Sequence, residues 1–163
     1  MIVVADTSVL INLCRVGQGE LFRRLFGEVV IPPEVANEFA RLASSALRFA
    51  GLSLPVGIRQ QAATTVPPLL QTATGLDPGE FAALALAVEI HADAVLVDEH
   101  IGHEYALKLG LRPLGVLGIL LRAKSSALLS EVRPVLDDLQ KDAGFWISQS
   151  LRDQVLGLAG ETN

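Results

Sequence analysis

Near its start the sequence reads IVVADTS at residues 2–8, a short β-branched run that stops at Asp6. Such a run predicts a buried strand, and the apolar residues at positions 9, 10, 13 and 16 predict a helix directly after it. Similar apolar strands are predicted at 29–31, 94–97 and 113–116, each followed by a helical pattern. Continuous apolar strands that alternate with helices are typical of a parallel sheet covered on both faces. We therefore predict an α/β fold, a three-layer α/β/α sandwich with a central parallel sheet.

The clearest helix start lies at residues 76–80, which read LDPGE. Asp77 is a favourable N-cap, Pro78 suits the first helical turn, and Glu80 completes a capping-box pattern. This helix is predicted to run to about residue 90. Glycines and prolines interrupt residues 44–75, where only a short strand near 56–58 and a short helix near 69–72 are predicted. The other predicted helices span 20–26, a stretch from 32–33 onward, 104–109, 118–124, 132–142 and 148–158.

The chain of 163 residues is half hydrophobic, with a mean hydropathy of +0.43. Its length predicts a single domain over residues 1–163. No apolar run reaches the roughly 18 residues of a membrane-spanning helix, and the first residues lack the positive charges of a secretory signal. We therefore expect a cytoplasmic protein without a membrane segment. Cys14 is the only cysteine, which excludes an internal disulfide or a thiolate metal cage, and we expect a buried, inert thiol.

The formal net charge is −5, whereas nucleic-acid-binding domains are usually basic. This balance argues against simple binding of a phosphate backbone, and the basic residues form no compact patch in the sequence. It does not exclude a nuclease, because a cluster of carboxylates can carry much of the negative charge and bound metal ions would offset it locally.

Four acidic residues fall where parallel sheets bind ligands, beyond the carboxyl ends of the strands. Asp6 and Asp98 each end a strand, Glu80 lies in the first turn of a helix, and Glu38 lies on the helix after the second strand. Each also has a simpler interpretation. The two aspartates could be N-caps, Glu80 could serve only its capping box, and Glu38 could be a solvated helix residue. At about 100° per residue, however, Glu38 lies near Leu42 at the edge of the apolar stripe.

Taken together, these acids predict a metal site. Clustered carboxylates repel one another, so a compact fold is not expected to gather four of them without compensation. Hard oxygen ligands suit Mg²⁺ or Mn²⁺, and Mg²⁺ takes one or two carboxylates directly and reaches others through water. Such a site can bind a phosphodiester, polarise its oxygen and activate a water for in-line attack.

At these positions the sequence resembles the PIN-domain nuclease family, in particular VapC-like toxins of bacteria and archaea. Residues 2–8, 30–39, 76–80 and 96–99 resemble the four family motifs, and the tail resembles an uncharacterised PIN-like sub-branch. The resemblance implies an endoribonuclease dependent on Mg²⁺ or Mn²⁺. It implies an RNA substrate, a homodimer and, for the toxin of a toxin–antitoxin pair, an antitoxin protein as partner. The catalytic and metal-binding acids that it implies are Asp6, Glu38, Glu80 and Asp98.

Three further residues are candidate accessories. Ser8, beside Asp6, could orient a water or a phosphate. Glu99 is a candidate fifth acid, with the alternative of a first-turn charge that the helix dipole favours. His103 stands in a stretch where relatives in the sub-branch often have an arginine, and a partly charged histidine is a poorer phosphate anchor. This departure predicts less efficient RNA cleavage without changing the metal site.

Other interpretations stay open. The chain could be a catalytically weak PIN-like module that binds protein or RNA, which the acidic charge and the missing arginine favour. His100 and His103, beside Asp98 and Glu99, could bind a softer metal such as zinc or manganese, although two exposed residues at a helix start are the simpler interpretation. A phosphatase with Asp6 as nucleophile is disfavoured, because serine occupies position 8, where a second aspartate would be needed. Trp146 is expected to be a core residue or a dimer anchor rather than a platform that stacks bases.

Overall fold

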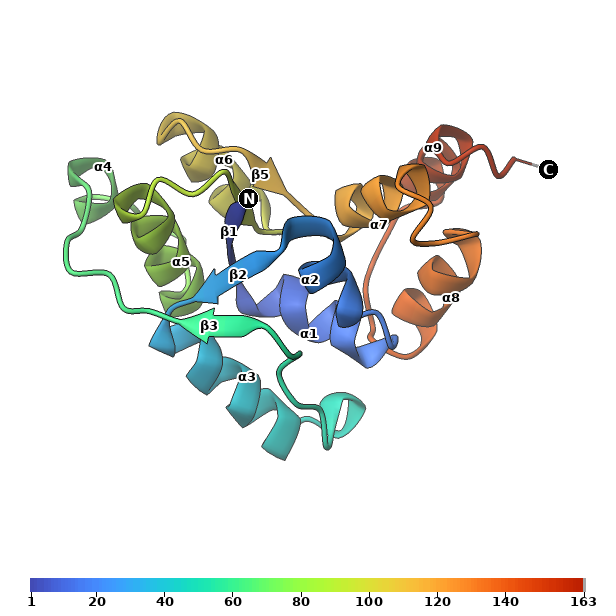
Figure 1. Ribbon diagram of the computed structural model, residues 1–163, viewed down its shortest axis with the longest axis horizontal. Coiled ribbons are helices and arrows are strands. Elements are labelled where there is room, and N and C mark those ends of the chain that lie inside the picture. The colour runs from blue at the N-terminus through green and yellow to red at the C-terminus, as the bar shows by residue number, and fades with distance from the viewer. Residues whose placement is uncertain (163) are drawn as a thin grey trace.

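The computed structural model describes residues 1–162. The fold is built around a five-stranded sheet (Figure 1). The strands lie in the order β3-β2-β1-β4-β5, and every pairing is parallel. The predicted central parallel sheet is therefore confirmed, with the first strand in its middle. The strands are β1 (Ile2–Ala5), β2 (Glu28–Ile31), β3 (Ile58–Gln60), β4 (Ala94–Leu96) and β5 (Pro113–Leu114).

Helices connect the strands and make up the C-terminal part of the chain. Across residues 1–162, every helix is too short or too polar to span a lipid bilayer. A short 3₁₀ turn follows the third helix at Leu47–Phe49. The helices are α1 (Thr7–Arg15), α2 (Glu20–Phe26), α3 (Pro33–Ser45), α4 (Pro68–Gln71), α5 (Pro78–Glu89), α6 (His100–Lys108), α7 (Val116–Ser125), α8 (Arg133–Lys141) and α9 (Gln149–Leu158).

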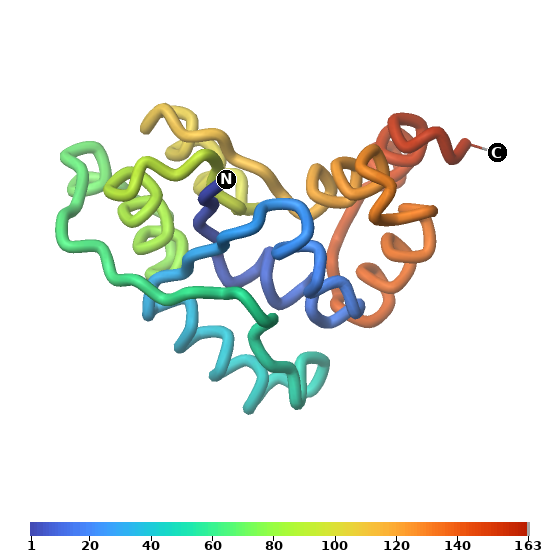
Figure 2. The backbone as a smooth tube through the Cα atoms, in the orientation of Figure 1, coloured from blue at the N-terminus to red at the C-terminus, as the bar shows by residue number. Residues whose placement is uncertain are grey.

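Helices cover both faces of the sheet, which confirms the three-layer sandwich. Val3 and Ala5 point into a core formed with α1, α2, α3 and α7, and α8 and α9 extend this core. Val4, Val30 and Val95 point to the opposite face, where α4, α5 and α6 cover them. Alternate residues of one strand are thus buried on opposite faces, which explains why the strands are apolar throughout. Figure 2 shows the C-terminal helices grouped beside α1, away from α4–α6.

Two predicted boundaries near the sheet edge are wrong. Helix α6 begins at His100 rather than at residue 104, because Glu99 has extended backbone angles and its carbonyl accepts the N–H of His103 at 2.9 Å. Strand β5 ends at Leu114 rather than at residue 116, because α7 already begins at Val116. In both cases a helix starts at the end of a strand earlier than the apolar pattern indicates.

The short strand β3 also lies two residues later than predicted. It pairs with β2 at one edge of the sheet, where Arg59 forms an ion pair with Glu28 at 2.7 Å. Val56, an apolar residue of the predicted strand, is exposed. Pairing with the neighbouring strand, rather than local hydrophobicity, decides the position of this element.

Two side chains differ from their expected burial. Trp146 is 83% exposed, so its interpretation as a core residue is wrong, while its role as a dimer anchor stays a prediction. Cys14 is half-buried rather than fully buried. Burial nevertheless raises the pKa of its thiol to about 11, which favours the inert, protonated form as expected.

Glu161, near the end of the described chain, connects the C-terminal helices through hydrogen bonds. The Glu161 carboxylate accepts hydrogen bonds from the backbone N–H groups of Val132 at 2.6 Å and Arg133 at 3.0 Å, and from Lys124 Nζ at 3.1 Å. These bonds join the residues after α9 to α7 and to the start of α8. The C-terminal helices are therefore held to one another as a unit beside α1.

Candidate metal centre

The four acidic candidates lie around one edge of the sheet. Asp6 directly follows β1, and Asp98 lies two residues after the neighbouring strand β4. The backbone N–H of Asp6 donates to the carbonyl of Leu96 at 2.9 Å, which fixes the end of β1 against β4. Glu80 lies in the first turn of α5 and Glu38 in the second turn of α3. Asp6 and Glu80 are buried, whereas Asp98 and Glu38 are half-buried.

Asp6 is not explained as a helix cap. It is the N-cap residue of α1, yet within residues 1–162 its side chain makes no capping hydrogen bond. Burial raises the pKa of this carboxyl to about 7, against the lowering effect of the Thr7 backbone N–H. The negative charges of Asp77, Glu38 and Asp98 raise it further. Asp6 is therefore close enough to the other acids for their charges to disfavour its ionised form.

Glu80 combines a structural role with an unused oxygen. Its Oε1 accepts the N–H of Asp77 at 3.3 Å, and Asp77 Oδ1 accepts the N–H of Glu80 at 2.8 Å, which confirms the capping box. Its Oε2 is buried and has no hydrogen-bond partner in the described part of the chain. Burial raises the pKa of the Glu80 carboxyl, and the side chain of Asp77 and the charge of Asp6 raise it further, whereas the bond from the Asp77 backbone N–H opposes this rise. The cap thus leaves one carboxylate oxygen free.

The two carboxylate oxygens of Asp98 also differ, because only one of them is hydrogen-bonded. Its Oδ1 accepts the backbone N–H of Val116 at 2.9 Å, so it caps α7 rather than the helix that follows it in sequence. Its Oδ2 is buried and unpaired among the described residues. Burial raises the pKa of the Asp98 carboxyl to about 6, the bond from Val116 opposes this rise, and the charge of Glu99 adds to it.

Helix N-termini gather at this edge, because helices that follow parallel strands begin where the strands end. Helix α1 begins directly after Asp6, α5 directly after Asp77, and α7 begins at the residue that Asp98 caps. The partial positive charge of a helix N-terminus favours a nearby carboxylate. These helix ends therefore offset part of the repulsion between the acids.

Five buried side-chain oxygens nevertheless lack a hydrogen-bond partner within residues 1–162. Each such unpaired group costs about 1–3 kcal/mol, so a ligand that satisfies several of them is expected. All are hard oxygen donors, and three belong to carboxylates, a set that fits Mg²⁺ or Mn²⁺ with its bound waters. The atoms are Asp6 Oδ1, Thr7 Oγ1, Ser8 Oγ, Glu80 Oε2 and Asp98 Oδ2.

The described acids do not by themselves form a complete set of metal ligands. Among the residues described, no three His, Cys, Asp or Glu side chains lie close enough to hold one ion by themselves. A Mg²⁺ ion would need only one or two direct carboxylates and would keep water as its other ligands. A zinc site at His100 and His103 is not supported, because a structural zinc site requires four protein ligands and a catalytic zinc site requires three. His100 instead pairs with Glu104, with 3.0 Å between Nε2 and Oε1.

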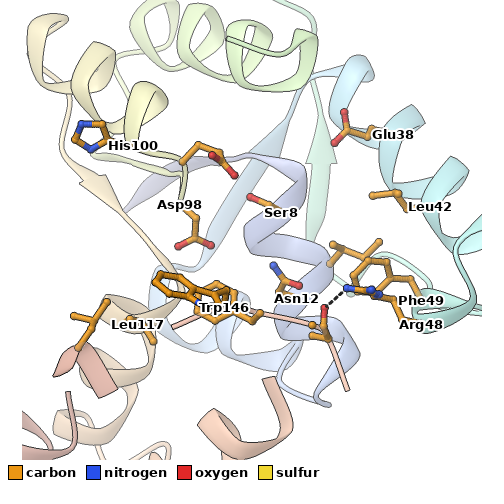
Figure 3. A pocket seen from close by; sticks show the side chains of 16 residues that line it. Ser8, Asn12, Glu38, Leu42, Arg48, Phe49, Asp98, His100, Leu117 and Trp146 are labelled. Carbon is orange, nitrogen blue, oxygen red and sulfur yellow. Dashed lines mark hydrogen bonds between the residues drawn. The ribbon is translucent and has the colours of Figure 1, made fainter. Parts of the chain in front are cut away.

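A cleft of about 570 Å³ opens at this acidic edge (Figure 3). Ser8, Glu38 and Asp98 line it, so the half-buried acids face a space that a substrate could enter. Asp6 and Glu80 are not among its lining residues. The rest of the lining comes from Ile11, Asn12, Leu42, Arg48, Phe49, Glu99, His100, Leu117, Leu151 and the segment Ala143–Trp146.

Two of the accessory candidates line the cleft and one does not. Ser8 and Glu99 are lining residues, and the buried hydroxyl of Ser8 is free to bond to a ligand. His103 is exposed on α6 outside the lining. The position at which the sequence resemblance leads us to expect an arginine therefore faces solvent, and Arg48 supplies a positive charge to the cleft instead.

Sequence reasoning missed three residues of this region. Asp77 was interpreted only as a cap, although its charge raises the pKa of Asp6. Asn12 lines the cleft one helical turn after Ser8, and that four-residue spacing could have indicated a shared face. Arg48 lies in the stretch where glycine and proline obscure the pattern, and no local signal indicates its position.

Comparison with known proteins agrees with this architecture. The family model DUF3368, described as a PIN domain, matches residues 2–161. A solved structure of a PilT N-terminus domain protein from the hyperthermophilic archaeon Sulfolobus solfataricus is similar, with a TM-score of 0.52 and 20% sequence identity. The similarity covers 73% of this chain and 90% of that one, and at this identity it concerns the fold alone. A search of curated proteins finds no significant match.

The family match spans almost the whole chain, and the parallel sheet with acids at its carboxyl edge is consistent with it. PIN domains are in general nuclease-type folds. The resemblance inferred from the sequence motifs is thus confirmed at the level of the family. This chain belongs to the DUF3368 family of PIN domains.

Proposed function

We propose that the protein is an endoribonuclease that hydrolyses RNA phosphodiester bonds with Mg²⁺ or Mn²⁺. The observation that carries the proposal is the set of buried carboxylate oxygens of Asp6, Glu80 and Asp98 that find no partner in residues 1–162. A purely structural acid would pair both of its oxygens. These acids pair at most one among the described residues, and we propose that the cleft of about 570 Å³ at the same edge receives the RNA strand.

Asp6 and Asp98 are the proposed direct ligands, because they follow adjacent strands and each has one free oxygen. Glu38 and Glu80 are proposed to act through water. A bound divalent ion would polarise a phosphodiester oxygen and favour deprotonation of a water for in-line attack. From the cleft side, the free hydroxyl of Ser8 would orient that water or the phosphate.

Hydrogen bonds within the chain hold two of these acids in place before a ligand arrives. Val116 holds one oxygen of Asp98, and Asp77 holds one oxygen of Glu80, so the free oxygen of each side chain has a defined direction. Such preorganisation reduces the cost of orienting the ligands when the ion and the substrate bind.

The finer assignments rest on family resemblance. We propose an antitoxin protein as a partner if the chain is the toxin of a toxin–antitoxin pair, and a homodimer as its assembly. The alternative is a catalytically weak module that binds RNA or protein. The net charge of −5 favours this alternative, as does the exposure of His103 outside the cleft. Tight RNA binding without cleavage, in the presence of either metal, would establish the alternative.

Metal removal tests the proposed activity. The full chain should cleave a labelled single-stranded RNA in Mg²⁺ or Mn²⁺, stop in EDTA, and recover when the metal is restored. Cleavage should follow the protein peak through size-exclusion chromatography, which excludes a contaminating nuclease. Cleavage that continues unchanged in EDTA would contradict a metal-dependent mechanism.

A second prediction concerns the space beside Glu80. Gly102 of α6 packs so closely that a Cβ there would lie 2.7 Å from Glu80 Oε2. Gly102→Ala should push that oxygen out of position and reduce metal-dependent cleavage by roughly tenfold. The melting temperature should hold or rise, because alanine favours a helix by about 1 kcal/mol over glycine.

Gly157→Ala is the matched control for this prediction. Gly157 lies in helix α9, where an added Cβ would make only ordinary contact, 3.8 Å from Thr162 Cγ2. Its cleavage rate should match that of the wild type. If Gly102→Ala also kept full activity, Glu80 would have no part in the proposed site.

A further inference from the structure

The exposure of Trp146 is a fixed feature of the fold. Its neighbours Ala143 and Ile147 are buried, and the N–H of Phe145 donates to the carbonyl of Leu139 at 2.9 Å. After it, Ser148 caps α9 by accepting the N–H of Leu151 at 3.1 Å. The backbone is therefore anchored on both sides of the indole, which is nevertheless 83% exposed.

This indole belongs to the same cleft as the acids. Trp146 lines the cleft together with Ser8 and Asp98, and Figure 3 draws the indole between Leu117 and Asn12, on the side toward which the Asp98 side chain extends. The large apolar residues Leu47, Leu107 and Leu158 are also exposed, but they are not among the lining residues. The aromatic surface is thus presented to whatever the acids act on.

A single guanidinium lies in the same cleft. Arg48 is the only lysine or arginine among its lining residues within the described chain, and it forms no ion pair there. Arg15 Nε donates to the carbonyl of Arg48 at 2.6 Å, and Arg48 Nη1 donates to the carbonyl of Ala143 at 3.3 Å. Its other N–H groups stay available to a ligand.

The link between Arg48 and the tryptophan segment depends on Gly144. This residue has a φ of +69°, which glycine adopts without strain, and an added Cβ would collide with the guanidinium of Arg48. The backbone that carries the indole therefore passes directly against the arginine. The segment that carries the indole is thus packed against the cation, and both residues line the cleft that Glu38 and Asp98 also line.

We propose that Trp146 and Arg48 form the substrate-positioning wall of the cleft, where the indole stacks on an unpaired nucleobase and the guanidinium contacts a backbone phosphate. Stacking on an aromatic side chain requires a base that is not paired in a duplex. An arginine matches a phosphate in charge and geometry. The substrate class is therefore single-stranded nucleic acid, with an unpaired base next to the phosphate that the acids would attack. This inference rests on the proposed nuclease function.

Fluorescence tests the stacking directly, because Trp146 is the only tryptophan of the chain. The full chain in EDTA, which prevents cleavage, is titrated with a labelled single-stranded oligoribonucleotide and with a blunt duplex of the same sequence. Anisotropy of the label measures binding, and the tryptophan emission measures stacking. The single strand should quench the emission in step with binding, and the duplex should leave it unchanged.

Kinetics separate positioning from chemistry. Trp146→Ala should raise the KM for single-stranded RNA by roughly 5- to 100-fold and leave kcat within about threefold, with Trp146→Phe in between. Leu158→Ala, which removes an exposed apolar side chain outside the cleft, should behave as the wild type. The melting temperature of all three variants should be unchanged, because the removed groups are exposed.

Two results would overturn the proposal. The first is a bound oligonucleotide that leaves the tryptophan emission unchanged. The second is an unchanged KM in Trp146→Ala, and if that variant also dissociates from dimer to monomer in sedimentation, the indole is a self-association anchor instead. If no oligonucleotide binds or is cleaved by the wild type, the proposed function itself fails, which is a different outcome from these two.

Discussion

Asp6→Asn is expected to abolish metal-dependent RNA cleavage, with a loss on the order of 100-fold or more. Asparagine keeps the shape of the side chain but removes the charge that a divalent ion requires. Asp6 is buried, its Oδ1 has no partner within residues 1–162, and it follows the central strand. The measurement is the initial rate of cleavage of a labelled single-stranded RNA in Mg²⁺ and in Mn²⁺.

The matched control is Asp93→Asn. Asp93 is an exposed aspartate at the start of β4, at the opposite end of that strand, where it accepts the N–H of Ile2 at 2.8 Å. This variant should cleave RNA at the wild-type rate. If Asp6→Asn also kept the wild-type rate, with its fold verified by circular dichroism, the proposed mechanism would be excluded.

Without metal, the free energy of unfolding is expected to fall as the pH rises from about 4 to about 7. Burial raises the pKa of Asp6 from 3.8 to about 7 and that of Asp98 from 3.8 to about 6. Over this range the folded state keeps protons that the unfolded chain has lost. Stability decreases with pH wherever the folded state binds more protons. Since one pKa unit corresponds to about 1.4 kcal/mol, the total loss should reach several kcal/mol.

Glu80, whose pKa is raised from 4.5 to about 8, adds to this decline and extends it beyond pH 7. The groups with a lowered pKa shape only the acid end of the profile. The pKa of Glu89 is lowered by hydrogen bonds from Thr64 and Thr65, and that of Glu161 is lowered by bonds from Val132 and Arg133, against the effect of its burial. A lowered pKa stabilises the fold above the unfolded value of 4.5 and loses that contribution as the pH falls. The decline between about pH 5 and 7 therefore belongs to the acidic cluster.

Chemical denaturation in EDTA across this pH range measures the effect. The wild type should lose stability toward pH 7, and Asp6→Asn should show a flatter profile and exceed the wild type near neutral pH. Added Mg²⁺ should restore the wild type at neutral pH and have little effect on the variant. If the stability of the wild type instead rose from pH 5 to 7 in EDTA, the pKa values of Asp6 and Asp98 would not be raised in the folded state.

The sequence predicts the sheet well because its strands are buried on both faces. Runs such as Val3-Val4-Ala5 are apolar at every position and buried throughout, as strands covered on both faces require. The pattern fails where contacts from other segments decide the structure. Strand β3 is an edge strand placed by β2, and α7 starts where its first N–H meets a side chain 18 residues away, Asp98.

The positions of the acids can also be predicted from the strand pattern, whereas those of Arg48 and Trp146 on the opposite wall of the cleft cannot. Asp6 and Asp98 end strands of one parallel sheet, and parallel strands end at the same edge, so their proximity follows from the topology. Trp146 reaches the cleft through the packing of the C-terminal helices beside α1, and Arg48 reaches it through the 3₁₀ turn that packs against α1 and α3. No periodicity in the sequence encodes that packing, and an isolated tryptophan next to a phenylalanine looks like part of a core.

The central claim is that the acidic edge holds a divalent metal ion, and a Mn²⁺ titration by calorimetry tests it without relying on cleavage. The wild type at about pH 8 should bind Mn²⁺, more weakly at about pH 6, where protons compete for Asp6 and Asp98. Asp6→Asn should lose at least about tenfold in affinity, while Asp93→Asn should bind as the wild type does. Equal Mn²⁺ affinity in the wild type and in Asp6→Asn, or no binding to the wild type at either pH, would contradict the claim.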